Sequence, residues 1–312
     1  MTDASPSPEL ANPEVVVIGS INLDLSLRVE RFPDSGETVL GQDLLRSGGG
    51  KGANQAVAAA RLGRRVAMVG AVGGDEVGGQ LLSHLEAEGI DVAAVEKLDG
   101  LPTGLAVIEV DDHGENRIVV ITGANGAISG QHAERAADLI AAAPVVLAQL
   151  EIPISVVNQL ATMKRSGLLV LNPAPASAEV DLSAVDILIP NRGELAALAG
   201  GTISTSTDEL IDQVRALPTG PSAVVVTVGG DGALVVTGLG HGTVEVEQVD
   251  ALPVTPVDTT AAGDAFCAAV ADALCLGADI GEATRWAVRV AAVTVTRRGA
   301  QQSLPHRSEL VS

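Results

Sequence analysis

Aromatic side chains are almost missing from this sequence of 312 residues. It contains no tyrosine, two phenylalanines and one tryptophan, which leaves nucleobases almost nothing on which to stack. Basic residues are also scarce, since 19 Lys and Arg stand against 39 Asp and Glu and give a formal net charge of −20. Nucleic-acid binding depends on cationic contacts with phosphates. Both shortages argue against a nucleic-acid partner.

Cysteines and long apolar runs are equally few. The only cysteines, Cys267 and Cys275, lie in one expected helix, whose rise of about 1.5 Å per residue separates their Cα atoms by roughly 12 Å, beyond disulfide reach. Reduced thiols are typical of the cytosol. No apolar run approaches the roughly 20 residues that span a bilayer, and the acidic, Pro- and Ser-rich N-terminus does not resemble a signal peptide. We therefore expect a cytoplasmic protein without a membrane partner.

Short apolar runs, by contrast, are abundant. Stretches such as "EVVVIGS" and "AVVVTVG" are apolar throughout and alternate with helical patterns such as "STDELIDQVRAL". This alternation predicts an α/β fold with a mostly parallel sheet covered by helices on both faces. The length fits one large domain, which we place at residues 14–305, after a flexible N-terminus of residues 1–13.

Two segments, at about 22–45 and 103–122, break this rhythm. Polar and apolar residues alternate in both, and both carry turn signals. Each segment is typical of a β-hairpin with one solvated face. Together they predict a small sheet that covers one end of the main domain as a lid.

The loop with the most glycines is "RSGGGKGANQAVAAARLG", residues 46–63. Its backbone N–H groups can approach a ligand closely because no side chains intervene. It is not a Walker A loop, because Gly52 follows Lys51 where Ser or Thr should bind magnesium. Asn54 is expected to project from the first turn of the following helix. The structural alternative is a flexible loop with a solvated lysine.

Three further places carry polar residues at the ends of expected strands. Gly229, Gly230 and Gly232 form a turn that suits phosphates, although Gly-Asp-Gly is also common in hairpins. Asn191 and Glu194 share a helical face and suit a magnesium–nucleotide site, or are simply a loop residue and a first-turn glutamate. Asn22, Asp24 and Glu151 follow strands in the crevice where open α/β sheets bind ligands. Such residues are common there, and none is decisive alone.

The stretch "DTTAAGDAF" places Asp264 where a turn of small residues becomes a helix. An aspartate at this position is also explained as a helix cap or as a favourable first-turn charge. Other enzyme classes fit poorly. The five histidines show no metal-ligand spacing, and "GSINLDL" lacks the Gly-x-Gly-x-x-Gly turn of dinucleotide-binding dehydrogenases.

Taken together, the motifs resemble those of the ribokinase family of carbohydrate kinases. The resemblance runs from about Val15 to Ser303 through "GSINLDL", "FPDSGETVLG", "GGGKGANQAVAAARLG", "ENRIVVITGANGAIS", "QLEIP", "LNPAPA", "PNRGE", "TVGGDGA", "DTTAAGDAF" and "TRRGAQQS". It implies a three-layer α/β/α domain with a β-sheet lid, through which members of the family commonly dimerise. It also implies in-line phosphoryl transfer from ATP to the 5-hydroxyl of D-ribose.

The resemblance implies a role for each motif. Asp264 would act as the base on the sugar hydroxyl, and the N-terminus of its helix would form an anion hole for the transferring phosphoryl group. The implied sugar-binding residues are Asn22, Asp24, Gly50, Lys51, Gly52, Ala53, Asn54, Glu151 and Asp264. The implied ATP-binding residues are Asn191, Thr227, Val228, Gly229, Gly230, Asp231, Gly232, Ala262, Gly263 and Val288.

Two cations are implied as well. Glu194 would organise Mg²⁺ through water, and K⁺ would be held by Asp258, Thr260, Thr294, Arg297, Gly299 and Ser303. Thr294 stands where the family usually has Ala, which matters little if its backbone carbonyl is the ligand. Val288 replaces an Asn or His that the family often places near adenine, so selectivity for the base of the nucleotide is in question.

Other substrates and another class of function stay open. The same chemistry could act on deoxyribose, fructose or adenosine, although "GGGKGANQ" and "FPDSGETV" favour ribose. A non-catalytic sensor of sugars or nucleotides is the alternative from another class. The intact Asp264, Lys51 and Glu194 argue against it, because a protein without catalysis would tolerate their loss.

Overall fold

The computed structural model describes residues 12–113, 115–240 and 243–310. Residues 1–11 of the predicted flexible N-terminus therefore lie outside the described residues. Among those described, no helix is both long and apolar enough to cross a membrane. Cys267 and Cys275 lie in one helix and both are free thiols, as expected.

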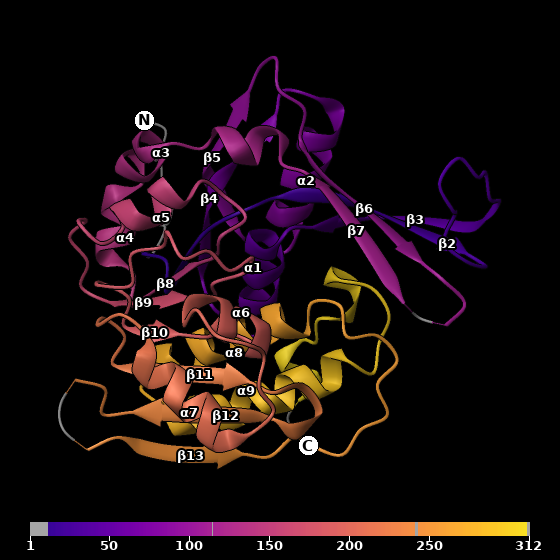
Figure 1. Ribbon diagram of the computed structural model, residues 1–312. Coiled ribbons are helices and arrows are strands. Elements are labelled where there is room, and N and C mark those ends of the chain that lie inside the picture. The colour runs from indigo at the N-terminus through magenta and orange to yellow at the C-terminus, as the bar shows by residue number, and fades with distance from the viewer. Residues whose placement is uncertain (1–11, 114, 241–242, 311–312) are drawn as a thin grey trace, which may run out of the picture.

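A large, mostly parallel sheet runs through the centre of the molecule (Figure 1). In the described residues its nine strands have the order β13-β12-β11-β10-β9-β8-β1-β4-β5. They are β1 (Val15–Ile18), β4 (Val66–Gly73), β5 (Asp91–Leu98), β8 (Val145–Ala148), β9 (Leu168–Leu171), β10 (Ile187–Leu188), β11 (Ala223–Thr227), β12 (Ala233–Thr237) and β13 (Glu245–Val249). Only the β11–β12 and β12–β13 pairs are antiparallel. Strands β1, β4 and β8 are buried along their whole length, which explains why their sequences are apolar throughout.

Helices cover both faces of this sheet and complete three layers (Figure 1). One face packs against α1 (Lys51–Arg61), α2 (Glu76–Ala87), α8 (Ala262–Cys275) and α9 (Ile280–Thr294). The other packs against α3 (Gly130–Arg135), α4 (Ala137–Ala142), α5 (Ile154–Gln159), α6 (Arg192–Leu198) and α7 (Thr207–Ala216). The α/β/α fold expected from the sequence is confirmed.

A smaller sheet extends from one side of the domain (Figure 1). It contains β2 (Asn22–Val29), β3 (Gly41–Gly49), β6 (Gly104–Val110) and β7 (Asn116–Ile121), in the order β3-β2-β6-β7. Strand β2 starts four residues after β1 ends, and β3 ends two residues before α1 begins. The small sheet is therefore joined directly to the glycine loop.

Two glycines allow α1 to begin against the first strand. Gly50 has a φ of +85°, a conformation that few other residues adopt. A Cβ atom on Gly52 would lie 2.6 Å from the backbone of Gly19 and Ser20. The glycine loop thus brings the N-terminus of α1 into direct backbone contact with the end of β1.

Helix α8 carries two buried aspartates that belong to different environments. Asp264 lies in its first turn, and Asp272 lies two turns later, where it accepts hydrogen bonds from Trp286 (2.8 Å) and Arg307 and forms an ion pair with Arg64 (3.0 Å). Asp272 therefore ties the C-terminal segment to α1, α8 and α9. This contact also places Trp286 in helix packing rather than in a ligand site.

Candidate active site

The predicted site residues gather at the carboxyl ends of the parallel strands. Gln149 and Glu151 follow β8, Asn172 follows β9, Asn191 follows β10, and the Gly229–Asp231 turn follows β11. The first turns of α1 and α8 reach the same edge of the sheet, since Asn54 contacts Asp264 there. Ligands of open α/β sheets bind at this edge.

Asp264 is the third residue of α8 and does not cap it. The N-cap is Ala261, whose φ of +59° makes the turn, and no side chain caps this helix end. Interpreting Asp264 as an N-cap is therefore wrong. Its carboxylate instead turns to α1, where the Asn54 side chain donates to Oδ2 (2.9 Å) and the Gln55 side chain donates to Oδ1 (3.1 Å).

Asp264 is only 5% exposed, and its environment pulls the pKa in two directions. Burial raises the pKa of Asp264, while the positive charge of Lys51 and the hydrogen bonds from Asn54 and Gln55 oppose that rise. The nearby Glu151 raises the pKa further. Donors on both oxygens stabilise the ionised carboxylate in a site that otherwise disfavours charge.

Lys51 brings a positive charge into an acidic site. The charge of Asp264 raises the pKa of Lys51, burial opposes that rise, and Glu151 and Glu194 add to it. The ammonium therefore stays protonated among carboxylates that come from different elements. Such a cation can attract and hold a phosphate.

Glu151 joins the first strand to the glycine loop. One of its oxygens, Oε2, accepts hydrogen bonds from the Ser20 hydroxyl (2.5 Å) and from the backbone N–H of Lys51 (3.0 Å). A carboxylate at the N-terminus of α1 is also favoured by the helix dipole. Its second oxygen, Oε1, makes no hydrogen bond with the described residues, and it can accept one from a ligand.

Asn22 and Asp24 lie at the start of β2 and face the site. Both side chains are buried, and the Asn22 oxygen accepts a hydrogen bond from Asn125 (2.7 Å). Burial raises the pKa of Asp24 to about 7, and the charges of Glu151 and Asp264 add to the shift. Asp24 thus changes charge near neutral pH.

We expect Asp24 to make the unfolding free energy depend on pH. Between about pH 4 and pH 7 the folded protein holds a proton on Asp24 that the unfolded chain has lost, so stability falls as the pH rises through this range. The effect on wild type relative to Asp24→Asn is up to about 4 kcal/mol. Urea unfolding of both proteins at a series of pH values checks this. A difference that does not change with pH would contradict it.

The two predicted nucleotide loops lie side by side. Asn191 forms an isolated bridge with Thr227, whose N–H donates to the carbonyl of Pro190 (2.9 Å). Asn191 caps α6 by accepting from the Glu194 N–H (2.8 Å), and its amide group donates to the Glu194 carboxylate (2.9 Å). The three-residue spacing therefore forms a capping box, and burial raises the pKa of Glu194, although a hydrogen bond with Asn191 opposes the rise.

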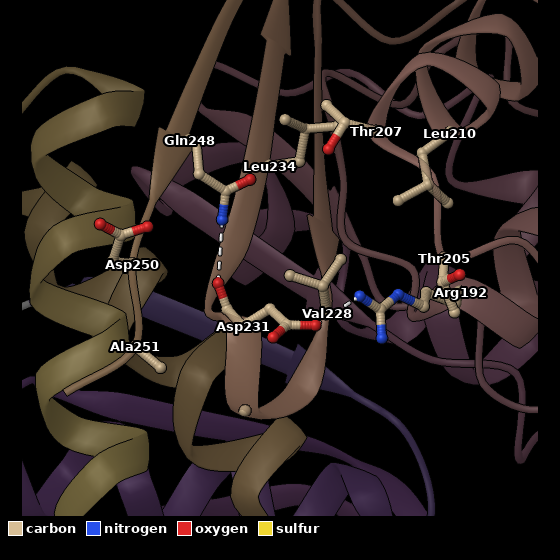
Figure 2. Close-up of a pocket in the computed structure, with 11 residues that line it drawn as sticks. Arg192, Thr205, Thr207, Leu210, Val228, Asp231, Leu234, Gln248, Asp250 and Ala251 are labelled. Atoms are coloured by element: carbon tan, nitrogen blue, oxygen red, sulfur yellow. Dashed lines mark hydrogen bonds and ion pairs between the residues drawn. The ribbon is translucent and has the colours of Figure 1, made fainter. Parts of the chain in front are cut away.

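An ion pair joins the same two loops. Figure 2 shows the Arg192 guanidinium pointing toward the Asp231 carboxylate, at 2.8 Å, while the Gln248 amide donates to the Asp231 carbonyl at 2.9 Å. These residues line a cavity of about 510 Å³ between α7 and β13. Val228, Gly230 and Asp231, which are predicted to bind ATP, line the cavity, whereas Asp264 and Lys51 do not. The cavity therefore adjoins the predicted ATP-binding turn and not the Asp264 carboxylate.

Val288 lies on α9 at a separate depression of about 290 Å³. Leu252, Arg285 and Arg289 line it together with residues of β13. An apolar side chain at this position offers a base contact area but no hydrogen bond. Val288 is buried, and its position near the base of a nucleotide stays a prediction.

The residues predicted to hold a monovalent cation come from two segments that meet. Asp258 accepts hydrogen bonds from the N–H groups of Thr260 (2.9 Å) and Gly299 (2.9 Å). Burial works against ionisation of Asp258, but these hydrogen bonds outweigh it and lower the pKa. The Thr294 hydroxyl donates to the Val290 carbonyl, the Ser303 hydroxyl donates to the Ala300 carbonyl, and Arg297 pairs with Glu309. Their side chains are thus engaged, and any ligands offered by Thr294 and Arg297 would be backbone carbonyls.

The side chains of the described residues do not form a complete divalent-metal site by themselves. Within residues 12–113, 115–240 and 243–310, no group of three or more His, Cys, Asp or Glu side chains could hold a metal ion. Mg²⁺ commonly binds through one or two carboxylates together with substrate phosphates. Glu194 fits that pattern.

Several residues that were not predicted from the sequence form hydrogen bonds or ion pairs with the predicted site residues. Ser20 holds Glu151, Arg192 joins the nucleotide loops, and Gln55 holds Asp264. Gln149 and Asn172 contact Gln55 in turn. All five lie in or beside quoted motifs, but no spacing rule distinguishes an amide that faces a carboxylate from one that packs in a core.

Comparisons with known proteins identify the family of this chain. The ribokinase of Schizosaccharomyces pombe is 38% identical over 309 residues, covering 95% of this chain and 96% of that protein. The deoxyribokinase of Salmonella typhi is 36% identical over 298 residues, covering 94% of this chain and 95% of that protein. The structure of Arabidopsis thaliana ribokinase complexed with ribose and ATP is 30% identical, with a TM-score of 0.83 over 96% of this chain and 97% of that one. A model of the pfkB family of carbohydrate kinases matches residues 12–307, and this chain belongs to that family.

Proposed function

We propose that this protein is an ATP-dependent ribokinase, which transfers the γ-phosphoryl group of ATP to the 5-hydroxyl of D-ribose. One observation carries the proposal. The Asp264 carboxylate is held by Asn54 and Gln55, next to Lys51, at the carboxyl edge of the sheet. This arrangement occurs in a chain that matches ribokinases along 95% of its length.

Asp264 is proposed to orient the hydroxyl and to accept its proton. The transition state of phosphoryl transfer is loose, so it needs positioning and charge stabilisation more than early removal of a proton. Asp264 thus takes the proton late in the reaction. The first N–H groups of α8 have no partners within the helix, and they point with the positive end of its dipole toward the transferring group.

The ribose is proposed to lie between the glycine loop and the start of β2. Asn22, Asp24 and Glu151 offer an amide and two carboxylates for its hydroxyls. The glycine loop offers the Lys51 charge and the Asn54 side-chain oxygen, which has no hydrogen-bond partner among the described residues. The ATP phosphates are proposed to lie along the Thr227–Gly232 turn toward Gly263. A Cβ atom on Gly263 would meet no described atom within 4 Å, so the space beside it is open.

A kinase assay over a panel of substrates tests the proposal. With ATP as donor, we expect D-ribose to give a higher kcat/KM than 2-deoxyribose, fructose or adenosine. Preference for another sugar or nucleoside would reassign the substrate, and the absence of any phosphorylation would overturn the proposed activity. The deoxyribokinase of Salmonella typhi, at 36% identity, makes deoxyribose the second candidate substrate.

Two cations are proposed to assist the reaction. Mg²⁺, held by Glu194 through water, would neutralise charge on the ATP phosphates. K⁺ would be held by the 258–260 and 294–303 segments, which pack directly behind the N-terminus of α8. The contacts of Asp258 with Thr260 and Gly299 support this placement.

Potassium is therefore expected to stimulate turnover severalfold. The ion would order the loop that supports the anion hole, and a cation of another size would order it less well. Initial rates in potassium, sodium and tetramethylammonium salts at one ionic strength check this. Equal rates in all three salts would contradict the proposed potassium site.

The small sheet is proposed to pair with a second copy of the chain. Its outer part exposes the apolar side chains Leu40, Leu44, Leu45, Ile118, Val119, Val120 and Ile121. Exposed apolar patches and open sheet edges favour association. Sedimentation velocity is expected to show a dimer that Val119→Lys converts to a monomer. A wild-type monomer at micromolar concentration would contradict the pairing.

A further inference from the structure

Three buried side-chain amides lie behind Asp264 and come from three different elements. Gln55 is in α1, Gln149 follows β8, and Asn172 follows β9. Gln55 and Gln149 are completely buried, and Asn172 is 8% exposed. Burying a polar group without a hydrogen bond is costly, so three amides at one place need an explanation.

The amides form a chain of hydrogen bonds that ends on the carboxylate. Gln149 Nε2 donates to Gln55 Oε1 (2.6 Å), and Gln55 Nε2 donates to Asp264 Oδ1 (3.1 Å). Gln55 Nε2 also lies 3.4 Å from Asn172 Oδ1, and Asn172 Nδ2 donates to the Ile189 carbonyl (3.0 Å). Each contact joins a donor to an acceptor.

The direction of this chain is set by its neighbours. The Ile189 carbonyl can only accept, so Asn172 must turn its own oxygen toward Gln55. Gln149 supplies a donor to the other end of Gln55. A flipped Gln55 would place its oxygen against two acceptors, those of Asn172 and Asp264, and its NH₂ group against the NH₂ group of Gln149. Only this orientation of Gln55 directs its NH₂ group to the oxygens of Asn172 and Asp264 and its own oxygen to Gln149 Nε2, while Gln149 Oε1 has no hydrogen-bond partner among the described residues.

We propose that Gln55, oriented by Gln149, is a positioning residue that fixes the Asp264 carboxylate and keeps it ionised. The inference rests on the proposed function, because it concerns the group that receives the proton of the sugar hydroxyl. Gln55 does not touch the substrate in this account. It acts through Asp264.

The charges around Asp264 explain why an amide is suited to this position. Lys51 from α1 is the positive group that lowers its pKa, while Glu151 after β8 raises it. Asp24 from β2, Glu194 from α6 and Cys267 from α8 also interact with the charge of Asp264. Negative groups are thus in excess. A neutral donor stabilises the carboxylate without adding a second cation that would bind it too tightly.

The two carboxylate oxygens of Asp264 accept hydrogen bonds from different residues, which leaves acceptor positions for the substrate. Asn54 donates to Oδ2 and Gln55 donates to Oδ1, which uses two of the roughly four acceptor positions of a carboxylate. The remaining positions can face the sugar hydroxyl. With both oxygens held, the carboxylate has one orientation, and loss of Gln55 frees it to rotate.

The test replaces Gln55 by methionine, which has a similar size but no donor. Losing a hydrogen bond to a charged group is expected to lower kcat about 10- to 100-fold, with the KM values for ribose and ATP nearly unchanged. The acidic limb of the kcat–pH profile is expected to move to higher pH. Gln149→Met is expected to shift it in the same direction with a smaller loss of kcat. A profile for Gln55→Met that superimposes on wild type would overturn the proposal.

A matched control separates positioning from general stability. Thr284 is also completely buried, on α9, and its hydroxyl donates only to the Ile280 carbonyl (2.7 Å). Thr284→Val is expected to lower the melting temperature but to leave kcat and the pH profile in place. If both variants only lower the melting temperature, Gln55 has a structural role alone and the proposal fails.

A second readout does not depend on turnover. With ¹³C-labelled aspartate and the Asp264→Asn spectrum for assignment, NMR follows the Asp264 carboxyl through a pH titration. Its pKa is expected to be higher in Gln55→Met than in wild type, and an equal pKa would contradict the proposal. If wild type does not phosphorylate ribose, the proposed function fails, and this titration still decides whether Gln55 holds the carboxylate.

Discussion

Replacement of Asp264 by asparagine is expected to lower kcat for ribose about 10²- to 10⁴-fold, the range associated with loss of a general base. Asparagine keeps the shape of the side chain but does not accept a proton at neutral pH. ATP binding and the fold are expected to stay intact, because Ala261 and not Asp264 occupies the N-cap position of the helix. Steady-state kinetics, nucleotide titration and circular dichroism together check these three statements.

Asp272→Asn is the matched control for this prediction. Asp272 is a fully buried aspartate on the same helix, but it pairs with Arg64 and Arg307 away from the site. Loss of its charge removes the carboxylate partner of Arg307 and leaves Arg64 with Glu14 alone. It is expected to cost about 3 kcal/mol of unfolding free energy, with kcat preserved. If Asp264→Asn keeps the activity of wild type, the assigned chemistry is wrong.

Replacement of Lys51 by methionine is expected to lower kcat/KM for ribose about 10²- to 10³-fold, comparable to removing one donor that stabilises charge in a transition state. Two effects add. The sugar site loses its partly buried cation, and the pKa of Asp264 rises because the charge of Lys51 no longer lowers it. The acidic limb of the pH profile is therefore expected to move upward. Kinetics at several pH values measure both effects.

Lys51→Arg separates the charge of this residue from its shape. It keeps a positive group next to Asp264 and Glu151, so the pH profile is expected to stay near that of wild type even if the larger side chain slows turnover. A pH profile that moves equally in Lys51→Met and Lys51→Arg would show that the charge is not what Asp264 responds to.

Much of the fold was predictable because local pattern and tertiary structure agree. Residues 15–18 and 145–148 are apolar throughout, and both strands are buried on both faces of the central sheet. Residues 103–122 form β6 and β7 of the small sheet, but β7 is exposed at every position although residues 118–121 are all apolar. The hydrophobic pattern therefore reflects the covered faces in the central sheet and does not do so in β7.

The candidate site was predictable where backbone geometry demands a residue type. Gly50 is needed for a positive φ, and Gly52 is needed for close contact with the end of the first strand. The glycine loop could therefore be predicted from the sequence. The pairing of Asn191 with Glu194 was equally visible, although the sequence left open whether it serves the helix or a ligand. The structure shows the capping box directly.

The supporting amides were not predictable for a physical reason. Gln149 lies 94 positions and Asn172 lies 117 positions after Gln55 in the sequence. Only the fold, which brings the start of α1 to the carboxyl edge of the sheet, places the three amides together. The sequence alone does not distinguish a buried glutamine from an exposed glutamine. Orientation of Asp264 depends on these distant contacts, so its two hydrogen bonds required coordinates.

The most direct measurement of the central claim is a crystal structure with ribose and a non-hydrolysable ATP analogue. The account predicts the 5-hydroxyl within hydrogen-bond reach of the Asp264 carboxylate, roughly 2.6–3.2 Å, and the γ-phosphate against the first turn of α8. A ribose bound with its 5-hydroxyl facing away from Asp264, or a γ-phosphate far from that helix end, would contradict it.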